Sequence, residues 1–268
     1  MNYTTIRERI PNGRGLNIAS ELYIPGSTDV PHPTVFLFHG FTGYKEGADL
    51  VDLSKKLAEH GIVAIRFTAT GLGDSDGTTE HDYLFSNYRK DADVVYGYFC
   101  HEPFVDTAHI GVFGHSLGGA LTVLFASDHP EIRALCAVSP VASFRDTYYG
   151  SIESEWKRKG YFEKISSRDG KTLRIPYAFF TDIEKPEHDI LRAAKMVSGK
   201  KALVIAGDQD TEVPMKESER VFGALASRAE FRVIPGMVHK YRSQPDIMER
   251  VNQSITAFFE GSLIGGAL

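Results

Sequence analysis

The chain has 268 residues, of which 42% are hydrophobic and 24% charged, and its formal net charge is −5 at pH 7. This length is sufficient for a sizeable buried core, and α/β folds often reach it as a single domain. The acidic balance argues against nucleic acid and against an anionic membrane surface as the main partner.

The sequence has no pattern of metal ligands and no targeting signal. We expect Cys100 and Cys136 to be small core or edge residues, with a disulfide between them as the weaker alternative. The histidines form no HExxH-type pair, so we expect neither a metal nor a cofactor. The polar start "MNYTTIRERIPNGRG" lacks the apolar centre of a signal peptide, and no apolar run has the length of a membrane span. These observations predict a cytoplasmic protein with no membrane partner.

Predicted strands and helices alternate along the chain. It opens with an antiparallel edge hairpin, predicted at residues 3–10 and 17–25 around "NGRG". Six apolar runs rich in Val, Ile, Phe and Ala follow, at 34–40, 61–69, 109–116, 133–140, 201–207 and 230–236. Helical periodicity marks the segments 47–60, 86–100, 118–128, 187–198, 215–227 and 245–259. Because the strand runs are continuously apolar, we predict an α/β fold whose mostly parallel, eight-stranded sheet is covered by helices on both faces.

One long segment interrupts this alternation. Residues 141–186 separate a predicted strand from a predicted helix and are far longer than an ordinary connecting loop. They are too rich in aromatic residues for a disordered linker, and Arg168-Asp169-Gly170 predicts a hairpin turn. We expect a small cap, inserted into a core formed by residues 1–140 and 187–268.

The stretch "HIGVFGHSLGGAL" carries the strongest functional signal. An apolar strand runs into Ser116, which lies between Gly114 and Gly118, and a helix follows. In a Gly-x-Ser-x-Gly turn the serine has a strained backbone, and side chains at the flanking glycines would collide with the adjacent strand and helix. The turn exposes the hydroxyl above the sheet and directs a helix N-terminus toward it, which favours developing negative charge. We therefore predict that Ser116 is a nucleophile.

A serine nucleophile needs a base, and the base needs an orienting carboxylate. In open α/β sheets these partners lie beyond the carboxyl ends of later strands. Asp210 and His239 follow the last two predicted strands, in the chain order Ser…Asp…His of hydrolases. Asp208 is the alternative acid.

The other histidines compete weakly with His239 as the base. His101, His109 and His129 lie at helix ends or at a strand start. His115 adjoins the serine, but we expect its side chain to point away from it.

With these residues in place, the chain resembles the α/β-hydrolase superfamily over nearly its whole length. The motifs that carry the resemblance are "HGFTG", "RFTATGLGDSDG", "GHSLGG", "GDQDTEVP" and "GMVH". Within the superfamily the chain is similar to acylaminoacyl-peptidase-like esterases, including bacterial cinnamoyl (feruloyl) esterases. The resemblance implies an oxyanion hole formed by the backbone N–H groups of Phe41 and Leu117. It also implies that the cap holds an aromatic acyl group. We expect most aromatic residues of the cap to form its own core. Trp156 and Tyr177 are the two that we expect to face the substrate.

The expected activity is hydrolysis of a small-molecule carboxylic ester through an acyl-enzyme, with feruloyl or cinnamoyl esters as the narrower expectation. The alternatives are a peptidase, amidase or thioesterase with the same triad, and a ligand-binding protein of this fold without turnover. The sequence leaves the oligomeric state open, including a homodimer.

Overall fold

The computed structural model describes residues 3–197, 199–225 and 229–265. Within these ranges an eight-stranded sheet has the order β1-β2-β4-β3-β5-β6-β9-β10. Its strands are β1 (Tyr3–Pro11), β2 (Asn17–Pro25), β3 (His32–Phe38), β4 (Val63–Phe67), β5 (Val105–His115), β6 (Ala134–Val138), β9 (Lys201–Gly207) and β10 (Ala229–Ile234). β2 is antiparallel to both neighbours, and the other neighbouring strands pair in parallel. The predicted mostly parallel sheet and its antiparallel edge hairpin are confirmed.

Each face of this sheet is covered by its own hydrophobic core. In β3, Phe36 and Phe38 belong to one core, whereas Val35 and Leu37 belong to the other. Successive side chains of a strand point to opposite faces, so a strand between two cores must be apolar at every position. This requirement explains why the strand segments of the sequence are continuously apolar.

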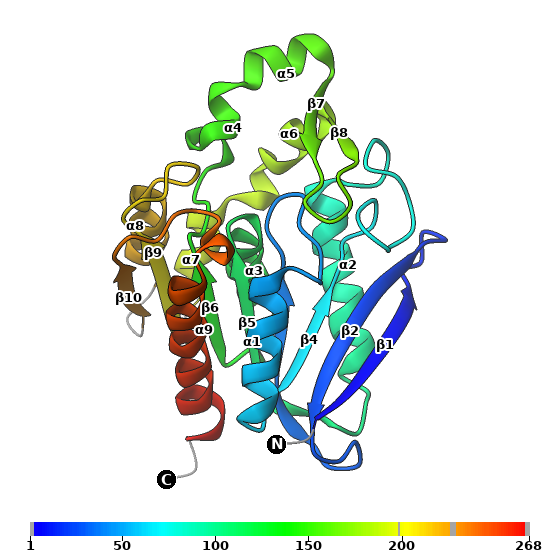
Figure 1. The fold of residues 1–268 in the computed structure, drawn as a ribbon, viewed down its shortest axis with the longest axis vertical. Helices are drawn as coiled ribbons and strands as arrows, with labels where there is room; N and C mark the ends of the chain where they lie inside the picture. The colour runs from blue at the N-terminus through cyan, green and yellow to red at the C-terminus, as the bar shows by residue number, and fades with distance from the viewer. Residues whose placement is uncertain (1–2, 198, 226–228, 266–268) are drawn as a thin grey trace.

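Helices supply the other half of both cores (Figure 1). One face packs against α1 (Ala48–Glu59) and α9 (Pro245–Phe259). The opposite face packs against α2 (Phe85–Phe99), α3 (Leu117–Asp128), α7 (Ile190–Met196) and α8 (Met215–Ala224). Among the residues that the structure describes, no helix is both long and apolar enough to cross a membrane.

Two of the predicted helices differ from the observed ones by more than one residue at an end. The helix expected at 187–198 begins at Ile190, because the carboxylate of Asp189 accepts a hydrogen bond of 2.9 Å from the backbone N–H of Arg192 and caps it there. A 3₁₀ turn, Pro186–His188, precedes this cap. Residue 198, and residues 226–227 of the helix expected at 215–227, lie outside the described residues.

Residues 141–186, here called the cap, lie between β6 and α7. They contain α4 (Tyr148–Ser151), α5 (Glu153–Lys159), β7 (Tyr161–Ile165), β8 (Thr172–Pro176) and α6 (Tyr177–Ile183). β7 and β8 pair in antiparallel fashion around the predicted turn and form a two-stranded sheet of their own. Figure 1 shows the cap at the end of the molecule opposite the two chain termini.

Aromatic packing attaches the cap to the core. The ring of Phe41, in the loop after β3, lies 4.7 Å from that of Tyr149 and 4.9 Å from that of Phe179, measured between centroids. Trp156 is 1% exposed, and its indole N–H donates a hydrogen bond of 3.0 Å to the carbonyl of Ile175. Burial of these rings fixes the cap over the loop after β3.

The connection from β5 to α3 is packed too closely for side chains. A Cβ at Gly114 would lie 2.0 Å from the carbonyl oxygen of Gly118, and a Cβ at Gly118 would lie 2.2 Å from the carbonyl oxygen of Phe38. Both obstacles are backbone atoms, which cannot rotate away as a side chain can. Glycine at both positions therefore allows the first turn of α3 to sit against the end of β3.

We expect Gly114→Ala to lower the free energy of unfolding by about 3 kcal/mol, because its methyl group must displace backbone. Gly97→Ala is the matched control: Gly97 lies in α2 with no atom within 4 Å of an added Cβ. It should raise the same free energy by about 0.5–1 kcal/mol, through its helix propensity. Urea unfolding of both variants measures this, and equal stabilities would contradict the packing argument.

Candidate active site

The backbone of Ser116 has the strained conformation that the sequence motif predicts. Its φ of 58° and ψ of −118° lie in a region that residues with a side chain rarely adopt. The turn is held by its own hydrogen bonds: the N–H of Ser116 donates to the carbonyl of Val138 at 2.8 Å, and its carbonyl accepts from the N–H of Ala120 at 3.1 Å. Ser116 thus stands at the junction of β5 and α3, where its hydroxyl faces a cavity.

A chain of two hydrogen bonds starts from that hydroxyl. The Oγ of Ser116 lies 3.0 Å from Nε2 of His239, and Nδ1 of the same imidazole lies 2.8 Å from Oδ2 of Asp210. The second oxygen of Asp210 accepts hydrogen bonds from the backbone N–H groups of Glu212, at 3.1 Å, and Val213, at 2.8 Å. A carboxylate fixed in this way accepts a hydrogen bond from Nδ1–H of His239 and leaves Nε2 free to accept one from the serine hydroxyl.

Hydrogen bonds distinguish the two aspartates that the sequence offered as the acid. Asp208 is exposed, and its carboxylate accepts a hydrogen bond of 2.7 Å from the backbone N–H of Gly236. It therefore braces the loop after β10, while Asp210 contacts His239.

The segment His39-Gly40-Phe41 lies directly beside Ser116. A Cβ on Gly40 would be 3.5 Å from the Cβ of Ser116. The His39 ring stabilises this loop: its Nδ1–H donates to the carbonyl of Gly40 at 2.8 Å, and its Nε2 accepts from the N–H of Ala69 at 3.1 Å. Burial lowers the pKa of His39 to about 4, so the ring is neutral and holds the loop by hydrogen bonds alone.

The two expected oxyanion donors come from different segments: Leu117 directly follows Ser116, and Phe41 belongs to the loop that packs beside it. Leu117 is the first residue of α3, where a helix leaves its N–H groups without acceptors in the helix. Phe41 follows Gly40, and the next residue is tied by the hydrogen bond of 2.9 Å from the Thr42 N–H to the phenol of Tyr83. Backbone N–H groups at these positions are suited to an anion that forms above Ser116.

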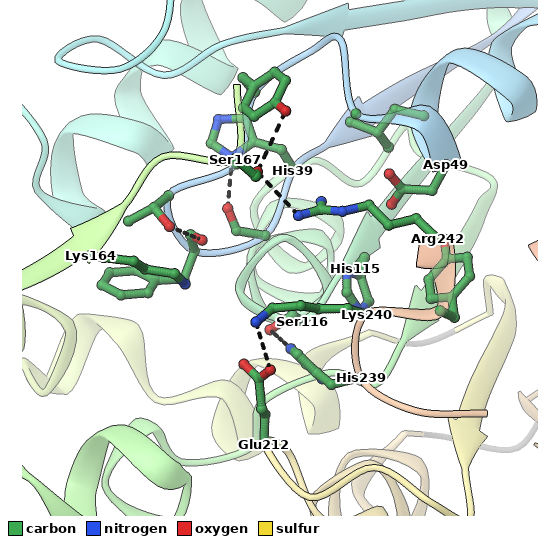
Figure 2. Close-up of a pocket in the computed structure, with 18 of the residues that line it drawn as sticks. His39, Asp49, His115, Ser116, Lys164, Ser167, Glu212, His239, Lys240 and Arg242 are labelled. Atoms are coloured by element: carbon green, nitrogen blue, oxygen red, sulfur yellow. Dashed lines mark hydrogen bonds and ion pairs between the residues drawn. The ribbon is translucent and has the colours of Figure 1, made fainter. Parts of the chain in front are cut away.

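Core and cap together enclose a cavity of about 200 Å³ (Figure 2). Ser116 and His239 line it from the sheet edge, and the cap contributes Tyr149, Lys164 and Ser167. Figure 2 shows that Lys164 and Arg242 extend into this region from different sides, while Lys240 turns toward Glu212. The walls therefore combine aromatic rings with several charged side chains.

Three expectations about side-chain direction were wrong. Trp156 and Tyr177 do not line this cavity: Trp156 is buried in the cap, and the Tyr177 hydroxyl donates to Glu153 at 3.0 Å. His115 does line it, with its ring centroid 4.9 Å from that of His239. The positive φ of Ser116 ends the regular strand geometry directly after His115, and both side chains reach the same cavity. Burial and the neighbouring His239 and Arg242 hold the pKa of His115 well below its usual value, so it is neutral.

The residues that sequence reasoning missed are Tyr149, Lys164 and Arg242. Arg242 lies three residues beyond His239, a proximity that could have suggested it. Nothing in the sequence indicates which face of the hairpin carrying Lys164 meets the cavity.

Comparison with known proteins agrees with this architecture. A model of the prolyl oligopeptidase family matches residues 86–265. The chain belongs to this family. The match spans Ser116, Asp210 and His239, whereas Phe41 precedes it.

Relatives of this prolyl oligopeptidase family member include named hydrolases. It is 29% identical to putative esterase/lipase 2 of Mycoplasma genitalium over 228 residues, which are 76% of this chain and 82% of that protein. It is 24% identical to the mitochondrial palmitoyl-protein thioesterase ABHD10 of Homo sapiens over 222 residues, which are 80% of this chain and 69% of that protein. Family and relatives identify the chain as a hydrolase.

A solved structure of Est1E from Butyrivibrio proteoclasticus, with ferulic acid bound, superposes with a TM-score of 0.75. It is 24% identical, and the superposition covers 96% of this chain and 99% of that one. The chain therefore has the α/β-hydrolase fold, as its sequence motifs imply.

The hydrogen bond from Ser116 to His239 predicts one unusually reactive serine. A fluorophosphonate probe should label the wild-type protein once, and Ser116→Ala should lose the label completely. Ser139→Ala is the matched control, since Ser139 is also buried with a positive φ of 44°, but its hydroxyl has no hydrogen-bond partner among the described residues. It should label like the wild type, as peptide mapping by mass spectrometry can check; a label retained by Ser116→Ala would contradict the assignment.

Proposed function

We propose that this protein is a serine carboxylesterase that hydrolyses carboxylic esters through an acyl-enzyme on Ser116. The observation that carries the proposal is the pair of hydrogen bonds from Ser116 through His239 to Asp210. This arrangement supplies the nucleophile, base and orienting acid that ester hydrolysis by a serine requires.

In the acylation step, Nε2 of His239 takes the proton of the Ser116 hydroxyl while Oγ attacks the ester carbonyl carbon. The carbonyl oxygen becomes an oxyanion, which accepts hydrogen bonds from the backbone N–H groups of Phe41 and Leu117. One such donor contributes about 10²–10³-fold to kcat in enzymes of this chemistry. The protonated imidazole, stabilised by Asp210, then gives its proton to the leaving alcohol, and the C–O bond to that alcohol breaks.

In the deacylation step, water replaces the alcohol. Nε2 of His239 takes a proton from the water as its oxygen attacks the acyl carbon, and the same two N–H groups hold the second oxyanion. The proton returns to Oγ of Ser116 as the acyl bond breaks, which releases the acid and restores the free serine. No step needs a group beyond the chain, the ester and water.

The relatives and the family differ in the kind of bond that their names imply, and therefore in the leaving group. The relatives described above are a putative esterase/lipase and a palmitoyl-protein thioesterase, while the family is named for oligopeptidases. The catalytic steps above are the same for an ester, a thioester and an amide. A matched series of these three bonds with one acyl group ranks them, and we expect the oxygen ester to have the highest kcat/KM.

The catalytic roles predict graded losses in kcat for a short-chain aryl ester. Ser116→Ala should abolish hydrolysis while circular dichroism shows an intact fold. Asp210→Asn should lower kcat by about 10⁴-fold, because the amide favours the wrong imidazole tautomer. Asp208→Asn keeps an acceptor for the N–H of Gly236 and should stay within a few-fold of the wild type. Full activity in Ser116→Ala would refute the proposal.

A finer proposal concerns the acyl group, which we expect to be aromatic. Phe41 and Tyr149 line the cavity with rings 4.7 Å apart between centroids, and aromatic acyl groups pack well against such rings. Methyl ferulate should therefore have a higher kcat/KM than methyl butyrate, measured by chromatography of the released acid. A higher value for methyl butyrate would remove the feruloyl assignment and leave the esterase assignment standing.

A further inference from the structure

The cavity beside Ser116 contains a lysine, Lys164, that forms no ion pair within the described part of the chain. Lys164 extends from β7 of the cap, and its ammonium donates a hydrogen bond of 3.0 Å to the Tyr149 hydroxyl. It also lies 5.1 Å from the centroid of the Phe41 ring and 5.5 Å from that of Tyr149. No carboxylate among the described residues forms an ion pair with it, although its hairpin neighbours Lys171 and Arg174 each have one.

One acidic residue of the cavity wall already forms an ion pair with another lysine. Glu212 pairs with Lys240, whose ammonium is 3.1 Å from the carboxylate (Figure 2). Asp49 is 5% exposed, and this burial raises its pKa and so favours its neutral form, although the charge of Arg242 opposes the shift. The carboxylates that line the cavity therefore leave an excess of positive charge.

Arg242 adds to this excess from another side of the cavity. Its guanidinium forms no ion pair among the described residues and donates a hydrogen bond of 3.4 Å to the Ser167 hydroxyl. In Figure 2 Lys164 and Arg242 enter the pocket from different sides, and the guanidinium of Arg242 is directed at Ser167. Two cations on different walls, with Nζ of Lys164 directed into the cavity, define a region suited to an anion.

Burying an ammonium without a counter-charge costs free energy, which an incoming anion recovers. Removing Lys164 from water lowers its pKa to about 8, an effect that Glu212 partly opposes and that Lys240 and Arg242 reinforce. Near neutral pH the side chain is still mostly charged. A charge-assisted hydrogen bond to a carboxylate is stronger than the bond to a neutral phenol that it makes now.

We propose that Lys164, with Arg242, binds an anionic group of the substrate, so that the preferred esters carry a carboxylate or a phosphate in addition to the ester. The inference rests on the proposed esterase function and names its substrate class. Because Lys164 packs on the ring of Phe41, whose backbone is a proposed oxyanion donor, the anion is held beside the reacting carbonyl.

Matched ester pairs test this inference and locate the anion. Monomethyl adipate against dimethyl adipate places the charge on the acyl side, and 4-acetoxybenzoate against its methyl ester places it on the alcohol side. For at least one pair, the wild type should prefer the anionic ester in kcat/KM at pH 7. Lys164→Met should reduce that preference by about ten- to a hundred-fold, in line with the loss of one charged hydrogen bond.

Lys171→Met provides the control, because it removes a charge from the same hairpin at an exposed position paired with Asp169. It should leave the preference unchanged.

Lys164→Gln, which can still donate to Tyr149, should lose the preference like Lys164→Met and guards against a folding defect in the methionine variant. The wild-type preference should also fall as pH rises above 8, where Lys164 loses its proton. Taking the ratio to the neutral ester cancels any effect of pH on the catalytic steps that both esters share.

The outcomes separate this inference from the esterase proposal. Hydrolysis of all esters without a preference for either anionic member would overturn the anion site and leave the esterase function standing. An equal loss for anionic and neutral esters in Lys164→Met would also overturn it. If no ester is hydrolysed, the esterase proposal fails, and calorimetry with adipate then decides the anion site alone: binding weakened at least ten-fold in Lys164→Met supports it, and unchanged or absent binding overturns it.

Discussion

The hydrogen bond between Ser116 and His239 is the contact on which the rest of the site depends. It joins residues 123 positions apart in the sequence, from loops that follow β5 and β10. In the sheet β6 and β9 separate these strands, so the loop after β10 has to return along the sheet edge. Gly207 makes that return possible, because a Cβ there would lie 2.2 Å from the carbonyl oxygen of Met237. Close backbone packing at such glycines therefore allows Ser116, Asp210 and His239 to meet at the sheet edge.

The site divides its work between two parts of the chain. The reactive groups and the expected oxyanion donors belong to loops at the edge of the rigid sheet, where close packing fixes their geometry. The cap adds Tyr149 and Lys164 to the wall of the cavity, and it contacts the core through the rings around Phe41. A segment attached in this way can change its lining residues without moving Ser116, so catalysis and substrate choice are separable in this fold.

The sequence was informative wherever one physical requirement dominated. Strands between two cores are apolar at every position, as in β3, and glycines appear where backbone meets backbone, as at Gly114 and Gly118. These patterns are local and can be found without coordinates. The pairing of Asp210 with His239 also followed, from the rule that partners lie at the carboxyl edge of the sheet.

Side-chain direction in the cap could not be predicted in this way. Aromatic density shows that a cap has a core, but it does not show which ring enters it, and Trp156 is buried where we expected a substrate contact. In β7 alternate residues differ in exposure, yet only the docking of the hairpin decides that Lys164 meets the cavity. The failure at His115 has another cause, since the strained backbone of Ser116 ends the strand alternation at that point.

The most direct test of the account is to trap the covalent intermediate. The protein is mixed with a slowly hydrolysed aryl ester, quenched in acid within the first turnover, and mapped by mass spectrometry. The account predicts a burst of one phenol per chain and one acyl group, carried by Ser116. Turnover without a burst, or an acyl group on any other residue, would contradict it.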